Sequence, residues 1–435
     1  MSESVQISFA SKTEQRDVLK NNYQRVRNKT EELCIPLATE DYVPQPIEDV
    51  SPPRWHLAHS TWFFETFLLK SFNKRYKEFH PKYSFLFNSY YQTVGERWQR
   101  VERGHLSRPT VQDIYTYRKR IDEQILALID NIDEEQWPEF RDIMTLGLNH
   151  EQQHQELLLT DLKYILCRNP LWPVYNTFEK NEIRISLSLP EDYFDYVEFD
   201  RGVFEVGYEG NGFYFDNEGP VQKVYLEPFR LRKGLVTNAE FLEFMEDDGY
   251  QNFRYWLSEG WDFVVNNNIK FPEYWHREDD QWFEATLNGY KELDLNAPVT
   301  HISFYEAEAF ATWAGKKLPT EFEWEVAAKL TNPEIRDSNL QDSYIFHPVP
   351  ALLPAAELYQ MVGDVWEWTH SSYLPYKGYK AAEGALGEYN GKFMINQMVL
   401  RGGSCATPAD HIRLSYRNFF HPDKRWQFTG IRLAE

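Results

Sequence analysis

The sequence predicts a two-domain protein of the α + (α+β) class, with a helical bundle over residues 10–170 and an α+β domain over residues 185–435. Long amphipathic segments fill the first part, with apolar residues at the spacing of one helix face. After about residue 175 the pattern changes to short alternating stretches, many turns and many tryptophans. A length of 435 residues is sufficient for two or three domains, which agrees with this division.

Four helices account for the predicted bundle. The first covers about residues 11–34, and the second begins with Ser51 as N-cap and Pro52 as first helical residue. A capping box at Thr110 starts the third helix, and the fourth covers about residues 139–166. Four long amphipathic helices of this kind favour a four-helix bundle.

The second part combines strands with a few short helices. The segments 182–189, 196–207 and 221–231 alternate apolar and polar residues, which predicts strands. Three T/S-x-x-E sequences predict the starts of short helices, at Thr237–Glu240, Ser303–Glu306 and Thr320–Glu323. Strands mixed with separate short helices indicate an α+β domain.

The composition argues against several classes of function. The 46 basic and 67 acidic residues give a net charge of −21, which is unsuited to coating DNA or an anionic membrane. No apolar run approaches the roughly 20 residues of a membrane span, and no signal peptide is predicted at the start. Three cysteines suit a reducing compartment. We therefore expect a cytoplasmic protein with neither nucleic acid nor membrane as partner, and its oligomeric state stays open.

The sharpest chemical feature is the sequence HEQQHQE at residues 150–156. On a helix, His150 and His154 are four residues apart and share one face, which is also the apolar face of the fourth helix. Two buried imidazoles without a partner are costly, so the pair predicts a metal site.

The second helix offers a third ligand in WHLAH. His59 shares a face with Trp55 and Trp62, whereas His56 is expected to point elsewhere, so spacing favours His59. Three neutral histidines suit zinc, iron or copper, and ligand type alone leaves the metal open. The same residues also match the HExxH signature of zinc peptidases, in which Glu151 would be the general base.

Longer motifs indicate a family. The first part resembles the DinB-like bundle, and the second resembles the formylglycine-generating-enzyme (sulfatase-modifying factor) domain, which has a C-type-lectin-like fold. The motifs that carry the second likeness lie at residues 297–329, 361–369, 399–408 and 415–434. Their order, together with WHLAH and HEQQHQE, resembles that of the ergothioneine-type sulfoxide synthases over almost the whole chain.

This resemblance implies a ligand set and a reaction. The family's iron is held by three histidines, which fall on His59, His150 and His154 here. Its members use Fe(II) and O2 as co-substrate to join a thiol to C2 of the imidazole of hercynine, leaving a sulfoxide. Holding several reactants on one metal ion removes much of the entropic barrier to such a reaction.

The resemblance also assigns a tyrosine and an anion clamp to one loop. A tyrosine that gives a proton or hydrogen atom during the reaction matches Tyr91 or its neighbour Tyr90, and we favour Tyr91. The carboxylate of the thiol substrate matches Arg100 and Arg103, whose planar guanidiniums suit carboxylates.

Hercynine carries a trimethylammonium group, which calls for aromatic and polar contacts. The resemblance places it at Asn418, Phe419 and Phe420, with Gln153 at its polar end. Relatives that use γ-glutamylcysteine have an acidic residue where this chain has Phe420, so free cysteine is the expected donor.

Three alternatives remain open at this stage. A selenoneine synthase would share this layout and use a selenosugar donor with hercynine. A zinc hydrolase would use HEQQH, and a binding module with the second fold would have no metal. The three inward histidines favour the enzyme readings.

Overall fold

The computed structural model describes residues 12–175, 188–351, 357–381, 383 and 385–435. It divides into two compact units. The first runs to Tyr90 and continues from Gly95 to Gln155, and the second comprises Tyr91–Val94 and Glu156–Glu435. Among the described residues, no helix is both long enough and apolar enough to cross a membrane.

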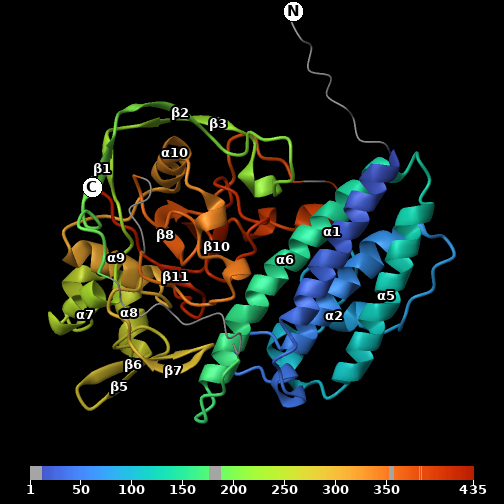
Figure 1. Cartoon of the computed structure of the whole chain (residues 1–435), viewed down its shortest axis with the longest axis horizontal. Helices are drawn as coiled ribbons and strands as arrows, with labels where there is room; N and C mark the ends of the chain where they lie inside the picture. Colours follow the sequence, from blue (N-terminus) through green and yellow to red (C-terminus); the bar gives the residue numbers. More distant parts are fainter. Residues whose placement is uncertain (1–11, 176–187, 352–356, 382, 384) are drawn as a thin grey trace, which may run out of the picture. The chain divides into compact units, whose positions relative to one another are not determined.

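The first unit is a helical bundle, as predicted. Its elements are α1 (Lys12–Glu32), a 3-10 helix (Thr39–Tyr42), α2 (Pro53–Phe64), a π-helical turn (Glu65–Leu69), α3 (Lys70–Phe72), α4 (Tyr83–Phe87), a second 3-10 helix (Arg100–His105), α5 (Val111–Asn131) and α6 (Trp137–Cys167). The four long helices α1, α2, α5 and α6 lie side by side in Figure 1. Helix α6 contributes its residues up to Gln155 to this unit and the remainder to the second.

Helix starts show one confirmed prediction and one error. Thr110 caps α5, and its hydroxyl accepts a hydrogen bond from the Asp113 backbone N–H at 3.1 Å. Ser51, in contrast, is not the N-cap of α2, because the helix begins at Pro53 with Pro52 as its N-cap. The Ser51 hydroxyl instead accepts a hydrogen bond from Arg103 Nη1 at 2.9 Å.

The described residues of the second unit form four small sheets and four short α-helices, with several 3-10 turns between them. The strands are β1 (Tyr196–Phe199), β2 (Gly202–Val206), β3 (Gln222–Leu226), β4 (Phe229–Arg232), β5 (Trp275–Glu278), β6 (Gln281–Thr286), β7 (Gly289–Glu292), β8 (Trp366–Ser372), β9 (Met398–Arg401), β10 (Asn418–Phe420) and β11 (Thr429–Gly430). They pair as β1-β4, β2-β3, β5-β6-β7 and β10-β9-β8-β11, and only the β8–β11 pair is parallel among these described strands.

The helices of the second unit are α7 (Asn238–Glu246), α8 (Ser258–Asn266), α9 (Phe304–Trp313) and α10 (Glu321–Thr331). The three capping boxes read from the sequence are confirmed at the starts of α7, α9 and α10. Strands predicted at 196–207 and 221–231 are confirmed as β1 to β4. The strand predicted at 182–189 falls mostly on residues outside those described. The predicted α+β class is therefore correct.

Candidate metal centre

Three buried histidines converge in the bundle. His59 on α2 and His150 and His154 on α6 place one ring nitrogen each within 4.8 Å of one another. The Nε2 atoms of His59 and His150 are 3.2 Å apart. All three rings are almost fully excluded from solvent. Helical spacing explains the α6 pair, since residues four apart lie one above the other on the same face.

The ring of His59 is fixed from several sides. Its Nδ1 lies 2.6 Å from the carbonyl oxygen of Phe87, to which it must donate, so Nε2 is left as the unprotonated nitrogen. The indole rings of Trp55 and Trp62 stack on the imidazole at 4.5 and 5.4 Å between centroids. His59 therefore shares a buried face with these two tryptophans, as its spacing predicted.

His56 does not point elsewhere, contrary to expectation. It is buried, and its Nδ1 lies 2.9 Å from Nδ1 of His154. Residues three apart on a helix differ by only about 60° in direction, so both fit within one stripe that is more than 100° wide. A separation of about 60° is therefore too small to turn His56 away from the cluster.

Burial keeps the cluster uncharged. Desolvation lowers the pKa of His150 to about 3 and holds the pKa values of His59 and His154 well below their usual range, with neighbouring histidines adding to the effect for the latter two. The imidazoles are therefore neutral at pH 7 and offer lone pairs. Three neutral nitrogens that face one another without charge fit a divalent transition metal, and three protein ligands leave further positions open for substrates.

Glu151 faces away from the histidines, into the junction of three helices. Its carboxylate accepts hydrogen bonds from Arg118 at 2.6 Å, Arg27 at 2.9 Å and the Thr30 hydroxyl at 2.7 Å. Burial by itself would raise its pKa, but the two guanidiniums lower the pKa to about 2. A carboxylate bound by two arginines is a poor proton acceptor, which removes the physical basis of the zinc-hydrolase interpretation.

The arginines predicted to bind a carboxylate lie on the 3-10 helix at Arg100–His105. Arg103 is buried, and its guanidinium carbon lies 3.4 Å from the centroid of the Trp55 ring, next to His59. Arg100 is exposed and donates to the backbone carbonyl of Asp49. Arg103 is therefore connected to the histidine cluster through Trp55, whereas Arg100 contacts Asp49 and Gln45.

The two candidate tyrosines, Tyr90 and Tyr91, differ in their exposure to solvent. Tyr91 is fully buried and Tyr90 is only partly buried. The residues after Tyr91 are held by Glu388, which accepts hydrogen bonds from the backbone N–H groups of Gln92 at 2.9 Å and Thr93 at 3.0 Å. Glu388 thus fixes the backbone that carries Tyr91, and sequence reasoning did not find it because the two segments are almost 300 residues apart.

The predicted hercynine segment forms β10. Asn418, Phe419 and Phe420 pair with β9 and are all partly buried. Phe419 stacks on Tyr373 with ring centroids 4.0 Å apart, and Phe420 packs edge-on against Trp426 at 5.8 Å. Gln153, the remaining predicted contact, is partly buried on α6.

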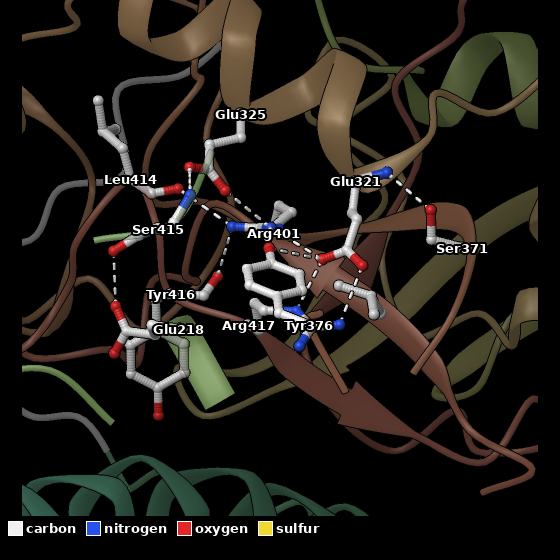
Figure 2. Close-up of polar contacts among 12 residues, drawn as sticks. Glu218, Glu321, Glu325, Ser371, Tyr376, Arg401, Leu414, Ser415, Tyr416 and Arg417 are labelled. Carbon is white, nitrogen blue, oxygen red and sulfur yellow. Dashed lines mark hydrogen bonds and ion pairs between the residues drawn. The ribbon is translucent and has the colours of Figure 1, made fainter. Parts of the chain in front are cut away.

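Arg417, the residue directly before β10, belongs to a buried network of ion pairs (Figure 2). Arg417 binds Glu321 through two nitrogens at 2.8 and 2.9 Å, and Arg401 of β9 binds the same carboxylate at 2.8 Å. The Arg417 guanidinium also lies over the ring of Tyr376. Since buried networks of charged hydrogen bonds rigidify a core, we expect this network to hold β10 firmly.

Sequence reasoning also missed Glu156, the last acid of HEQQHQE. It is partly buried in the second unit, where it accepts hydrogen bonds from Trp366 Nε1 at 2.6 Å and Ser404 Oγ at 2.7 Å. Burial raises its pKa despite these donors. Its place two residues after a predicted ligand was the available signal. Trp366 itself is a buried core residue.

Comparisons with known proteins match a family to each of the two predicted domains. The DinB superfamily model matches residues 22–158, and that of the sulfatase-modifying factor enzyme 1-like domain matches residues 190–346 and 334–435. The formylglycine-generating enzyme of Thermomonospora curvata is 34% identical over 283 residues, which cover 55% of this chain and 92% of that protein.

Other relatives match both halves at once. The hercynine oxygenase of Mycolicibacterium smegmatis is 31% identical over 409 residues, covering 88% of this chain and 91% of that protein. That of Mycolicibacterium thermoresistibile is 30% identical over 419 residues, covering 88% and 87%. The resemblance inferred from the motifs is thereby confirmed. Because these matches extend through the bundle and the α+β domain together, the chain belongs to the hercynine oxygenase family.

Proposed function

We propose that this protein is an Fe(II)- and O2-dependent sulfoxide synthase that joins cysteine to C2 of the hercynine imidazole. The observation that carries the proposal is the cluster of three neutral, buried histidines in a chain whose relatives are hercynine oxygenases. His59, His150 and His154 would hold the iron through one nitrogen each. Bound iron would supply open coordination positions and the electrons that activate O2.

The net reaction balances without a further co-reactant. Hercynine loses the hydrogen on C2, and cysteine loses its thiol hydrogen. One atom of O2 enters the sulfoxide and the other leaves as water. The electrons lost in forming the C–S bond and in oxidising the sulfur together reduce one O2. No separate reductant is needed, so cysteine, hercynine and O2 suffice as substrates.

The chain's own residues would bind and orient the two organic substrates. Arg103 and Arg100 would bind the cysteine carboxylate, and the stack of Arg103 on Trp55 supports this role for Arg103. Phe419 and Phe420 would offer aromatic faces to the trimethylammonium group, with Asn418 beside them. Gln153, between the two ligands on α6, would hydrogen-bond the polar end of hercynine.

Tyr91 would provide a phenolic O–H during C–S bond formation. Its full burial supports this assignment over Tyr90, since a buried hydroxyl exchanges little with solvent and its proton stays available to the reaction. The Glu388 contacts to Gln92 and Thr93 support it further, because they restrict the backbone that follows Tyr91.

Cysteine is proposed as donor because Phe420 stands where relatives that use γ-glutamylcysteine have an acidic residue. The partly buried Phe420 packs against Trp426 and offers no charge. A selenosugar donor would contain no carboxylate, so it would not use the Arg100–Arg103 clamp.

The test is aerobic incubation of the Fe(II)-loaded protein with hercynine and cysteine, followed by mass spectrometry. We expect a product heavier than hercynine by cysteine and one oxygen atom, less two hydrogens. His150→Ala and a zinc-loaded sample should both give none. Inertness with cysteine, γ-glutamylcysteine and a selenosugar would contradict the function, and turnover with either of the last two alone would contradict the donor assignment.

A further inference from the structure

The histidine left out of the metal cluster, His56, has a defined contact with it. Its Nδ1 lies 2.9 Å from Nδ1 of His154, with ring centroids 5.2 Å apart and planes inclined by 58°. Both rings are buried. Two ring nitrogens at this distance share one hydrogen, so one ring donates and the other accepts.

The direction of this hydrogen bond follows from the role of His154. If its Nδ1 is occupied by His56, only Nε2 remains to act as a metal ligand, and Nε2 must then be unprotonated. A neutral imidazole carries one proton, which therefore sits on Nδ1 and is donated to Nδ1 of His56. His59 is arranged in the same way, with its Nδ1 donating to the carbonyl of Phe87.

We propose that His56 is a positioning residue that fixes the tautomer and ring orientation of His154 for metal binding. This inference rests on the metal site of the proposed function. Histidines that bind metals nearly always donate their second N–H to an acceptor, and loss of that acceptor weakens metal binding by about 10–100-fold. An imidazole acceptor is neutral, so it orients His154 without placing negative charge beside the metal.

Two substitutions of His56 distinguish the role of its hydrogen-bond acceptor from that of the imidazole ring itself. His56→Leu preserves the volume and removes the acceptor, whereas His56→Asn places an amide oxygen close to the position of Nδ1. Thr61→Val is the matched control, because Thr61 is a buried polar residue of the same helix whose hydroxyl contacts Leu57 and Arg27 rather than the histidines.

The experiment measures Co(II) binding to the metal-free protein under nitrogen. Calorimetry gives the dissociation constant, and the visible spectrum reports the coordination of the ion. We expect His56→Leu to raise the dissociation constant by about 10–100-fold. His56→Asn and Thr61→Val should stay within about fivefold of the unchanged protein, and His56→Asn should keep the spectral shape. Circular dichroism of the metal-free variants establishes that each is folded.

Two outcomes would overturn the inference. Unchanged Co(II) affinity in folded His56→Leu would show that His154 needs no acceptor. A loss in His56→Asn of 10-fold or more, or an altered spectrum, would show that the ring itself is required, and this holds even if His56→Leu fails to fold. Because Co(II) binding needs no hercynine, a failure of sulfoxide formation would leave this test unaffected.

Discussion

At the scale of single residues, the hydrogen bond made by one ring nitrogen of a histidine determines whether the other ring nitrogen is free of a proton and able to bind a metal. His59 donates from Nδ1 to a backbone carbonyl, and its Nε2 lies 3.2 Å from Nε2 of His150, whereas Nδ1 of His154 contacts His56. Stacking of Trp55 and Trp62 on His59 then restricts rotation of that ring. Preorganised ligands of this kind lose less conformational entropy when a metal binds.

Tyr91→Phe tests the residue assigned to proton or hydrogen transfer. Removal of the hydroxyl should slow C–S bond formation and leave the competing oxidation of cysteine to its sulfinic acid, so the ratio of sulfoxide to sulfinic acid should fall by roughly tenfold or more. Quantitative mass spectrometry of both products measures this ratio.

Tyr90→Phe is the control for that change, because Tyr90 is the neighbouring, partly exposed tyrosine. It should keep the product ratio of the unchanged protein. A fall in Tyr90→Phe without one in Tyr91→Phe would transfer the role to Tyr90, and unchanged ratios in both variants would remove the tyrosine from the proposed chemistry.

The sequence was sufficient to predict the candidate ligand histidines, but not the residues that contact them. Helical spacing alone predicts the i, i+4 pair of α6, whereas the choice of His59 within WHLAH rested on its face and on the family resemblance. The contact between His56 and His154 depends on how α2 and α6 pack, and no local pattern contains that information.

At the scale of elements, α6 presents different chemistry on different faces. His150 and His154 face α2, while Glu151, about 100° further round the helix, faces α1 and α5. Nearer the C-terminal end of α6, Lys163 is buried in the second unit, where it contacts Glu284 at 3.0 Å and His301 at 2.7 Å. A sequence motif such as HExxH does not distinguish these faces, which is why it suggested a general base.

Glu151→Gln tests the structural role of that acid. It leaves the buried guanidiniums of Arg27 and Arg118 with a neutral partner, so we expect the free energy of unfolding of the metal-free protein to fall by about 2–4 kcal/mol. Glu31→Gln is the control, since Glu31 pairs with Arg118 from a partly exposed position and should cost less than about 1 kcal/mol.

Chemical denaturation followed by circular dichroism measures both values. Unchanged stability of Glu151→Gln would contradict the proposed role of the Arg27–Glu151–Arg118 group. A hydrolase would show the opposite pattern, with stability intact and its activity abolished.

At the scale of the whole molecule, local sequence patterns predicted the two parts and their classes better than their connections. Capping boxes and alternation are local, so α7, α9, α10 and the first strands could be predicted. The sheet order β10-β9-β8-β11 joins segments far apart in the sequence, and the Glu388 contacts do the same. Such pairings follow from the packed core, which no window of the sequence describes.

Buried acids also make stability depend on pH. Burial raises the pKa of Asp364 from 3.8 to about 6, although Asn339, Val349 and Gln360 all donate to its carboxylate. A folded-state pKa above the unfolded value means that this group contributes stability fully below about pH 4 and loses it as the pH rises through 6.

Asp364→Asn removes this titration. The stability of the unchanged protein relative to the variant should therefore increase by about 1 kcal/mol when the pH is lowered from 7 to 5. Denaturation curves at both pH values measure this difference. A difference that does not change between pH 7 and pH 5 would show that Asp364 is ionised in the folded protein at both.

The central claim is that the three-histidine site uses O2 to build a sulfoxide. The most direct measurement is the product mass after incubation of the Fe(II)-loaded protein with hercynine and cysteine under ¹⁸O₂ in ordinary water. We predict that one ¹⁸O atom enters the product, which shifts its mass by the difference between ¹⁸O and ¹⁶O. A product that contains only oxygen from water, or no product joining the two substrates, would contradict the claim.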